Sequence, residues 1–252
     1  MTMRRLDTRC ALASAFALVA SSPSLTRAQD AAAPDTVKHW AFTGNLGLAI
    51  VSGNTSLTTI TAGDELTWHS GPWKVKQIFG LIYGKNDSVE TANQVFFGLR
   101  GEYQFASRWS TYLGARFDRN PFAGFSSRYG ENVGVTWNAV VAPKDKLDLE
   151  GGFGLTQQRN TDGTSENFPN GRGAFLYKHS WQEKTYFQEA FEVLPDLKDS
   201  KNLRMNSLAE LVAPISSHIG MRLSYLVQYD REPQPGFKTT DQTLSAGLQF
   251  SF

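Results

Sequence analysis

The sequence predicts an all-β protein, an antiparallel up-and-down transmembrane β-barrel of about twelve strands. Three observations support this prediction. Residues 244–252 alternate apolar and small or polar side chains up to the final Phe252, as the closing strand of a bacterial outer-membrane barrel does. About twelve such alternating segments fill the chain, an even number. Tight turns and longer polar loops alternate between them. A mean hydropathy of −0.34 excludes a helical membrane protein but fits a barrel, whose strands face water on one side.

The first residues predict a secretory signal peptide over residues 1–28. Arg4 and Arg5 precede an apolar run that is too short to span a bilayer as a helix, and Thr26 and Ala28 place small residues before the expected cleavage point. Residues 29–39 are predicted to form a short periplasmic linker, and residues 40–252 a single barrel domain. Cys10, the one cysteine, lies in the predicted signal peptide, so disulfides and thiolate sites are not expected in the mature chain.

The strands are predicted in order from their period-2 alternation. Residues 40–51 lead through a tight turn to residues 55–69, whose apolar face also carries Asp64; a bulge near Gly63 would turn that carboxylate away from lipid. Residues 73–83 set apolar side chains against lysines. The later strands, each long enough to cross a membrane when tilted, are predicted at residues 94–105, 109–119, 128–142, 146–160, 172–181, 185–194, 203–213, 218–230 and 239–252.

The connections sort by length. Short turns are predicted at residues 70–72, 106–108, 143–145, 182–184 and 214–217, and longer loops at residues 85–93, 120–127, 161–171, 195–202 and 231–238. A barrel with periplasmic termini has tight turns inside and longer loops outside. A soluble β-sandwich, the alternative fold, has no reason to sort its connections in this way. Tryptophans at strand ends on the short-turn side predict an interfacial aromatic belt: Trp40, Trp68, Trp73, Trp109 and Trp181.

Three stretches carry a family resemblance: the early hairpin at residues 52–55, residues 116–119 together with 122–125 and Arg128, and the ending at residues 238–252. In these stretches the chain resembles the salt-induced outer-membrane protein family, domain of unknown function 481. The resemblance implies an outer-membrane barrel and a link to salt or osmotic stress. It implies no reaction or ligand, so no functional residue is transferred from it.

Strand parity predicts a charged lumen. The predicted lumen-lining residues are Lys74, Lys76, Arg100, Glu102, Arg116, Asp118, Asp148, Glu150, Arg172, Lys178, Glu192, Arg204, Glu210 and Arg222. They favour a narrow channel for small solutes or ions, in which arginines surround the constriction. The alternative is a closed structural or envelope-stress barrel filled by paired charges, because about twelve strands fall between filled and open barrel sizes.

A membrane-embedded lipid hydrolase is the second alternative, and it would need a nucleophile beside a histidine base. The histidines, His39, His69, His179 and His218, have no serine and third polar partner at a recognisable spacing. We therefore expect no enzyme activity, no catalytic residue and no cofactor. The acidic residues of the outer loops show no convergence typical of a metal site, so no metal is expected either.

The predicted location is the outer membrane of a Gram-negative bacterium. Leu248, Phe250 and Phe252 are predicted to form a C-terminal signal for the barrel-assembly machinery. The other expected partners are outer-membrane lipids and lipopolysaccharide, whose phosphates would meet basic rim residues: Lys85, Arg119, Arg128, Lys201 and Lys238. The near-neutral charge argues against nucleic acid as a partner. The sequence predicts no oligomeric state.

Overall fold

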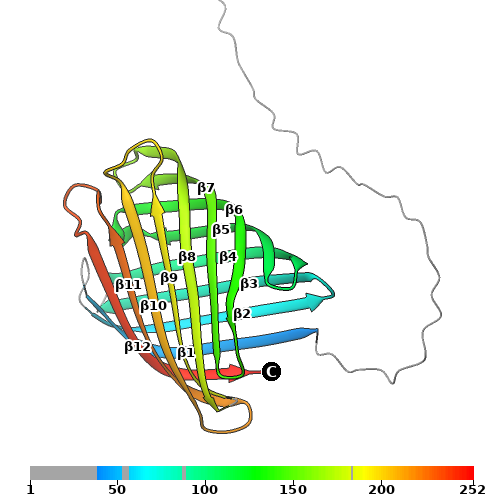
Figure 1. Ribbon diagram of the computed structural model, residues 1–252. Helices are drawn as coiled ribbons and strands as arrows, with labels where there is room; N and C mark the ends of the chain where they lie inside the picture. Colours follow the sequence, from blue (N-terminus) through cyan, green and yellow to red (C-terminus); the bar gives the residue numbers. More distant parts are fainter. Residues whose placement is uncertain (1–38, 53–56, 87–88, 183) are drawn as a thin grey trace, which may run out of the picture. The chain divides into compact units, whose positions relative to one another are not determined.

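The computed structural model describes residues 39–52, 57–86, 89–182 and 184–252, which form a closed antiparallel barrel (Figure 1). The predicted all-β barrel of about twelve strands is confirmed, with each strand next to its neighbour in sequence and β1 paired to β12. Within these residues, no helix has the length and apolarity needed to cross a membrane. The predicted signal peptide lies outside the described residues, as does the predicted linker apart from His39.

The strands are β1 (Trp40–Ser52), β2 (Leu57–Ser70), β3 (Trp73–Asn86), β4 (Val89–Ala106), β5 (Trp109–Asn120), β6 (Phe125–Val141), β7 (Asp145–Asn160), β8 (Ser165–Gln182), β9 (Thr185–Pro195), β10 (Leu203–Pro214), β11 (Ile219–Asp230) and β12 (Thr240–Ser251). One short 3₁₀ helix, η1 (Pro121–Ala123), connects β5 to β6.

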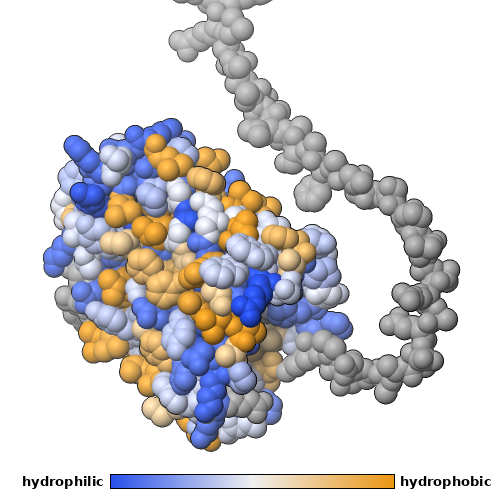
Figure 2. Space-filling model, viewed as in Figure 1, coloured by the Kyte–Doolittle hydropathy of each residue, from blue (hydrophilic) through white to orange (hydrophobic). Residues whose placement is uncertain are grey.

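Side chains alternate between the two faces of the wall. On β5, Leu113 is 67% exposed whereas Tyr112 is 1% exposed, so apolar side chains point outward and the neighbouring ones inward. Figure 2 shows orange, hydrophobic side chains gathered over the middle of the wall. A wall that is apolar outside and polar inside is the arrangement of a barrel surrounded by lipid.

Three predicted loops are wrong because the strands run further than the apolar pattern does. The loop predicted at 120–127 is reduced to residues 121–124, since β5 ends at Asn120 and β6 begins at Phe125. β3 and β4 continue to Asn86 and Val89 in place of the loop at 85–93, and β8 begins at Ser165 in place of the loop at 161–171. Most of the extra residues are polar, yet they pair across strands: Lys85 lies opposite Glu90 and Gln158 opposite Glu166. Backbone pairing does not require apolar side chains, so the hairpins extend beyond the apolar band.

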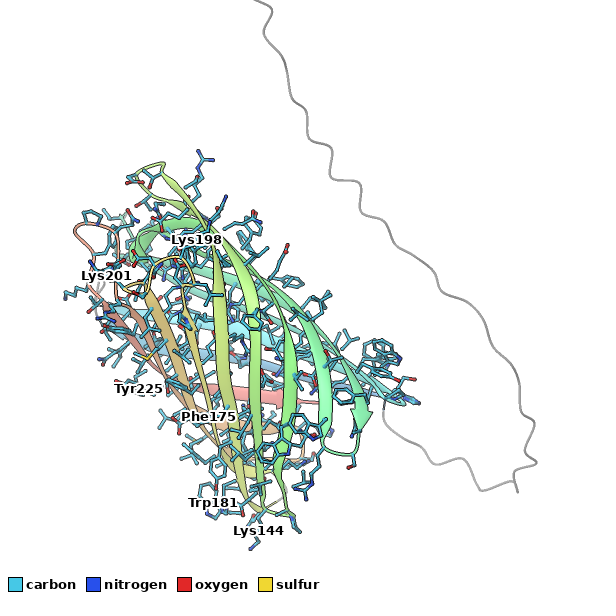
Figure 3. All side chains as sticks on the ribbon, turned by 45° about the horizontal axis from the view of Figure 1, so that its top comes forward. Lys144, Phe175, Trp181, Lys198, Lys201 and Tyr225 are labelled. Atoms are coloured by element: carbon cyan, nitrogen blue, oxygen red, sulfur yellow. The ribbon has the colours of Figure 1, made fainter. Side chains whose placement is uncertain are left out.

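The remaining long connections join β9 to β10 and β11 to β12, at residues 196–202 and 231–239. Both lie at the same end of the barrel, opposite the short turns. Figure 3 shows this separation: Lys198 and Lys201 lie at one end, and Lys144 and Trp181 lie at the other. These two end regions are called the long-loop end and the short-turn end below.

The predicted bulge near Gly63 does not occur. β2 pairs continuously with β1 and β3 through this region, and Asp64 lies opposite Gly44 and the outward-facing Phe79. Asp64 therefore faces outward. Register shifts occur instead near the strand ends, as at Gly84/Lys85 and Ser180/Gln182. An acidic side chain facing lipid costs less than a basic one.

Tryptophans gather at the short-turn end in cross-strand pairs. The ring centroids of Trp40 and Trp68 are 6.2 Å apart, and Trp109 stacks on Trp137 at 5.8 Å. Trp73 lies 4.8 Å from Tyr103. Trp137 was not among the tryptophans predicted for the belt, because it lies within its predicted strand and not at the strand's end; the pairing with Trp109 places it in the belt. The pairs form an aromatic band of the kind found at a membrane interface.

The first and last strands meet through glycines and end on an aromatic contact. Gly47 lies opposite Gly247, and a Cβ on Gly47 would come within 2.7 Å of the Ala246 carbonyl oxygen. Beyond them, the Phe252 N–H donates to the Phe42 carbonyl (2.9 Å), and the two rings are 6.5 Å apart. The terminal residue therefore joins the two ends of the barrel sequence.

Candidate functional site

The inward face of the barrel is defined by contacts that must pass through the interior. Arg100 on β4 bonds to Glu150 on β7, with β5 and β6 lying between these strands. Following the strand register from these two residues, every predicted lumen-lining residue has inward parity. The arrangement brings most of them into ion pairs.

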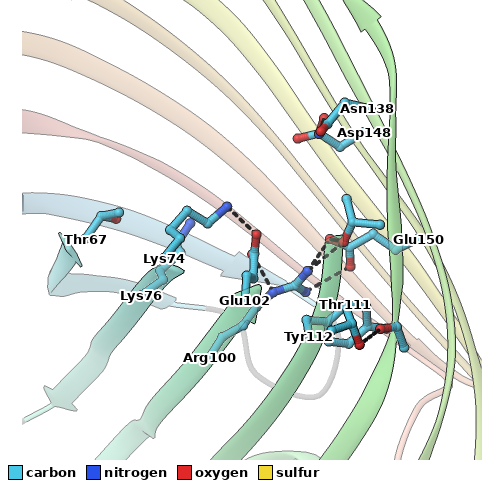
Figure 4. Close-up of polar contacts among 12 residues, drawn as sticks. Thr67, Lys74, Lys76, Arg100, Glu102, Thr111, Tyr112, Asn138, Asp148 and Glu150 are labelled. Atoms are coloured by element: carbon cyan, nitrogen blue, oxygen red, sulfur yellow. Dashed lines mark hydrogen bonds and ion pairs between the residues drawn. The ribbon is translucent and has the colours of Figure 1, made fainter. Parts of the chain in front are cut away.

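The central feature is a continuous charge network. Figure 4 shows its first part: Glu102 lies between Lys74 and Arg100, and Arg100 reaches across to Glu150. The links are Lys74–Glu102 (2.6 Å), Arg100–Glu102 (2.7 Å), Arg100–Glu150 (2.7 Å), Arg172–Glu150 (2.5 Å) and Arg172–Glu192 (3.1 Å). The network thus connects five strands, from β3 to β9. Asn206 on β10 extends it by donating to Glu192 (2.8 Å).

Tyr112 contacts both arginines at the centre of the charge network. Its ring lies over Gly134 and Gly152, where a Cβ would come within 2.5 Å and 2.7 Å of the tyrosine oxygen. Arg100 stacks above this ring at 3.8 Å, and Arg172 donates to its hydroxyl (2.9 Å). The stacking fixes the plane of Arg100, so its N–H groups are oriented toward the carboxylates. Side chains larger than glycine at these two positions would displace the ring.

A second arginine, Arg116, also stacks on an interior aromatic ring, but water reaches it more easily. Phe96 lies against Gly80, and the Arg116 guanidinium stacks 4.6 Å from the Phe96 centroid. Arg116 also bonds to Asp118 (2.8 Å), yet its side chain is 39% exposed. The arginines of the charge network are 13–20% exposed. Water therefore reaches some interior charges and is largely excluded from others.

Three further interior contacts surround the charge network. Lys76 pairs with Glu65 (2.7 Å), and the two side chains are 33% and 45% exposed. Arg222 pairs with Glu210 across β10 and β11. Asp148 accepts a hydrogen bond from Asn138 (2.6 Å). Lys178 has no carboxylate within ion-pair distance among the described residues, and its ammonium lies 3.8 Å from the Tyr186 ring centroid.

Side chains also meet across the interior toward the long-loop end. Gln94 on β4 donates to Gln228 on β11 (3.5 Å), so side chains from distant strands meet across the interior. A cavity of about 30 Å³ lies beside this contact, lined in part by Asn120, Phe122 and Asp241. A space of that size holds one or two water molecules.

The β11–β12 loop lies over this end. Gln234 donates to Glu166 on β8 (2.9 Å), and a Cβ on Gly124 would come within 3.1 Å of the Phe237 ring. The loop thereby lies against β8 and against Gly124, the residue that follows η1.

In the β7–β8 turn, the hydroxyl and the backbone N–H of Thr164 both donate hydrogen bonds to the Asp162 carboxylate. These bonds hold the pKa of that carboxyl below its usual value.

Arg128 was predicted to be a basic rim residue, and this is wrong. β6 begins at Phe125, before the predicted start, so Arg128 lies within the strand on its inward face. It donates to Gln158 (2.6 Å), stacks on Phe125 (3.9 Å) and pairs with Asp230 at 3.7 Å. Arg119, by contrast, lies opposite Val95 on the outward face.

The histidines do not form a nucleophile, base and acid triad among the described residues. His179 contacts Asp145 (2.8 Å), whose other partner is the Tyr177 hydroxyl. His218 contacts the neighbouring Ser217 (2.8 Å) and stacks on Phe252. His39 contacts the carbonyl oxygen of His69. In the same part of the chain, no three His, Cys, Asp or Glu side chains converge as a metal site would require.

Several interior side chains were not predicted, two of them uncharged and one a carboxylate. Tyr112, Thr136 and Glu65 complete or support the ion pairs, and none was singled out. A usable signal was present: an inward-parity aromatic residue beside inward-parity glycines on the next strands predicts a ring lying over them. Parity also places Glu131 and Glu189 on the outward face with Asp64. These acidic residues were not expected there, because the outward face was predicted to be apolar.

Comparisons with known proteins agree with the architecture. Residues 44–252 match the family described as "Protein of unknown function, DUF481". The chain is 23% identical over 216 residues to the uncharacterized protein YdiY of Escherichia coli K12, with 83% of each chain covered. Among solved structures, the NanC porin superposes with a TM-score of 0.56 at 12% identity, covering 82% of this chain and 98% of that one. The translocator domain of autotransporter NalP from Neisseria meningitidis gives 0.49 at 9% identity, covering 87% and 90%.

Proposed function

The chain belongs to the DUF481 family, and we propose that it is an outer-membrane barrel whose charged lumen passes small ions or solutes. The NanC structure, described as a porin, shares its fold. In this proposal the short turns face the periplasm and the long loops face the exterior, as in bacterial outer-membrane barrels. The link to salt or osmotic stress implied by the family resemblance is part of the same proposal.

The observation that carries this function is the water access of the interior ion pairs. Arg116, Lys76 and Glu65 keep between a third and a half of their side chains exposed although they point into the barrel. A lumen filled only to stabilise the wall would exclude water from such pairs. Charges that water reaches create a field along a low-dielectric wall, and such a field selects ions.

The proposed surroundings follow from the location. The apolar outward face would contact outer-membrane lipids, and Lys201 and Lys238 in the exposed loops would meet lipopolysaccharide phosphates. The barrel-assembly machinery would recognise the C-terminal residues Leu248, Phe250 and Phe252. Leu248 and Phe250 point outward on β12, beside β1 and β11, where an assembling edge strand would present them.

A closed-lumen structural barrel remains the second candidate, and a specific observation favours it. The charge network and the Gln94–Gln228 contact both cross the interior, the first over five strands and the second between distant walls. If neither rearranges, they block the passage of solutes. The lipid hydrolase has no comparable support, because the histidine contacts described above lack a serine and a carboxylate on one base.

The experiment that separates the first two candidates is the ion selectivity of Arg116→Ala. Removing this exposed guanidinium leaves Asp118 uncompensated in the water path, so the reversal potential under a KCl gradient should shift toward cation selectivity. Thermal stability should change by no more than about 1 kcal/mol, as for other exposed ion pairs. Arg119→Ala is the matched control, since Arg119 lies on the same strand and faces outward. Conductance at the lipid background together with a much lower unfolding temperature of Arg116→Ala would favour the closed lumen.

A further inference from the structure

We propose that Arg128 and Arg204 form a binding site for the carboxylate or phosphate group of a small anionic solute, inside the long-loop end of the lumen. This inference rests on the proposed function and assigns a chemical class to the solute. The two guanidiniums come from β6 and β10 and share the same interior region.

Arg204 is a buried arginine whose hydrogen-bond donors are only partly satisfied. It is 6% exposed, and no carboxylate lies within ion-pair distance of it among the described residues. Its guanidinium donates to the Thr156 hydroxyl (2.9 Å), and its Nε is buried without a hydrogen-bond acceptor from the described chain. Leaving a buried charged donor unpaired is costly. Buried charged groups of this kind occur often at binding sites.

The carboxylate that would be expected to pair with Arg204 is engaged elsewhere. Asp230 lies directly opposite Arg204 in the β10–β11 register. Its carboxylate instead contacts Arg128 at 3.7 Å, a long ion pair, and accepts a hydrogen bond from the backbone N–H of Glu232 (3.2 Å). Arg128 and Arg204 repel each other, and both are attracted to Asp230. Two guanidiniums therefore share one carboxylate.

The other nearby acids are already held. Asp118 is bonded through both oxygens to Arg116 (2.8 and 3.0 Å). Asp196 accepts hydrogen bonds from the backbone N–H of Lys198 (2.7 Å) and from the Asn202 amide (3.1 Å). Glu192, which also attracts Arg204, is bonded to Arg172 and Asn206, so none of these acids forms an ion pair with Arg204. An oxyanion between the two would supply the acceptors that they lack.

Aromatic rings hold both guanidiniums in fixed planes. Arg128 stacks on Phe125 at 3.9 Å, and Arg204 lies 5.1 Å from the Phe168 centroid. Both rings are buried. A guanidinium fixed by stacking loses little entropy on binding and presents a planar fork that matches carboxylates and phosphates. This geometry favours an oxyanion over a neutral sugar or a hydrated chloride ion.

Binding is tested on the full-length barrel refolded in octyl glucoside, a detergent without phosphate, by calorimetric titration with sodium phosphate and separately with sodium acetate. We expect wild type to bind at least one probe, and the preferred probe distinguishes a phosphate site from a carboxylate site. Arg204→Gln should weaken binding by about tenfold or more, the value of one charge-assisted hydrogen bond. Arg128→Gln provides the same test if Arg204→Gln does not fold. Arg119→Gln, on the outward face, should bind as wild type does.

Asp230→Asn gives a result of opposite sign. This change removes the competing carboxylate while keeping an acceptor for the Glu232 N–H, so affinity for the probe should rise. Absence of binding to both probes, or affinity unchanged in Arg204→Gln and Arg128→Gln, would overturn the inference. Because the titration needs no membrane, a barrel that conducts ions without binding the probes contradicts only this inference. A barrel that binds them without conducting contradicts only the proposed function.

Discussion

Replacing Glu150 with Gln is expected to lower the free energy of unfolding by about 3–5 kcal/mol, the usual cost of removing one partner from a buried ion pair. Glu150 accepts hydrogen bonds from both Arg100 (2.7 and 3.0 Å) and Arg172 (2.5 Å), and its side chain is 13% exposed. Its loss leaves two guanidiniums facing each other above Tyr112 with little water to solvate them. The measurement is urea unfolding of the barrel in detergent micelles, followed by tryptophan fluorescence.

The matched control is Glu65→Gln, which removes the carboxylate of the exposed Lys76–Glu65 pair. It should cost about 1 kcal/mol or less, as exposed ion pairs do. If the two variants unfold at the same urea concentration, the charge network does not stabilise the barrel, and the distinction drawn here between enclosed and water-accessible pairs is wrong.

Removing Phe252 should prevent most of the chain from assembling in the outer membrane. Phe252 is the last residue of the closing sequence, exchanges two backbone hydrogen bonds with Phe42 (2.9 and 3.1 Å), and stacks on His218 at 5.5 Å. Its deletion therefore removes both the predicted recognition residue and a contact between the first and last strands. The measurement is the amount of heat-modifiable, folded barrel in the outer-membrane fraction.

Two comparisons identify the cause of that loss. Phe252→Ala keeps the backbone contact with β1 and removes the ring, so it should also assemble poorly if the ring is recognised. Deletion of residues 29–36 shortens the predicted linker and should leave assembly nearly intact. Normal assembly of the chain without Phe252 would show that the terminal aromatic is neither a signal nor a required contact.

Strand parity explains why the fold and the inward residues were accessible from sequence. A β-strand sends alternate side chains to opposite faces, so an apolar row such as Leu244, Ala246 and Leu248 identifies the outer face and assigns the residues between them to the lumen. The Trp40–Trp68 and Trp109–Trp137 pairs follow from the same rule together with the preference of tryptophan for the interface.

The contacts between lumen residues could not be predicted from the sequence. Parity places Arg100 and Glu150 inside, but their contact across β5 and β6 depends on the barrel's cross-section and strand stagger. Local hydropathy also misjudged the strand ends. The polar residues around Glu90 and Glu166 indicated loops, whereas cross-strand backbone pairing continues through them. The misplacement of Arg128 had the same origin, since β6 begins earlier than its apolar pattern.

The central claim is that the lumen conducts, and the most direct test is single-channel recording of the refolded wild-type barrel in planar bilayers with KCl on both sides. We expect discrete current steps above the lipid background, with a conductance that rises with salt concentration. Lipid without protein and heat-denatured barrel are the controls. Correctly folded barrel that inserts into the bilayer and produces no current steps would contradict the claim and leave the closed-lumen barrel in its place.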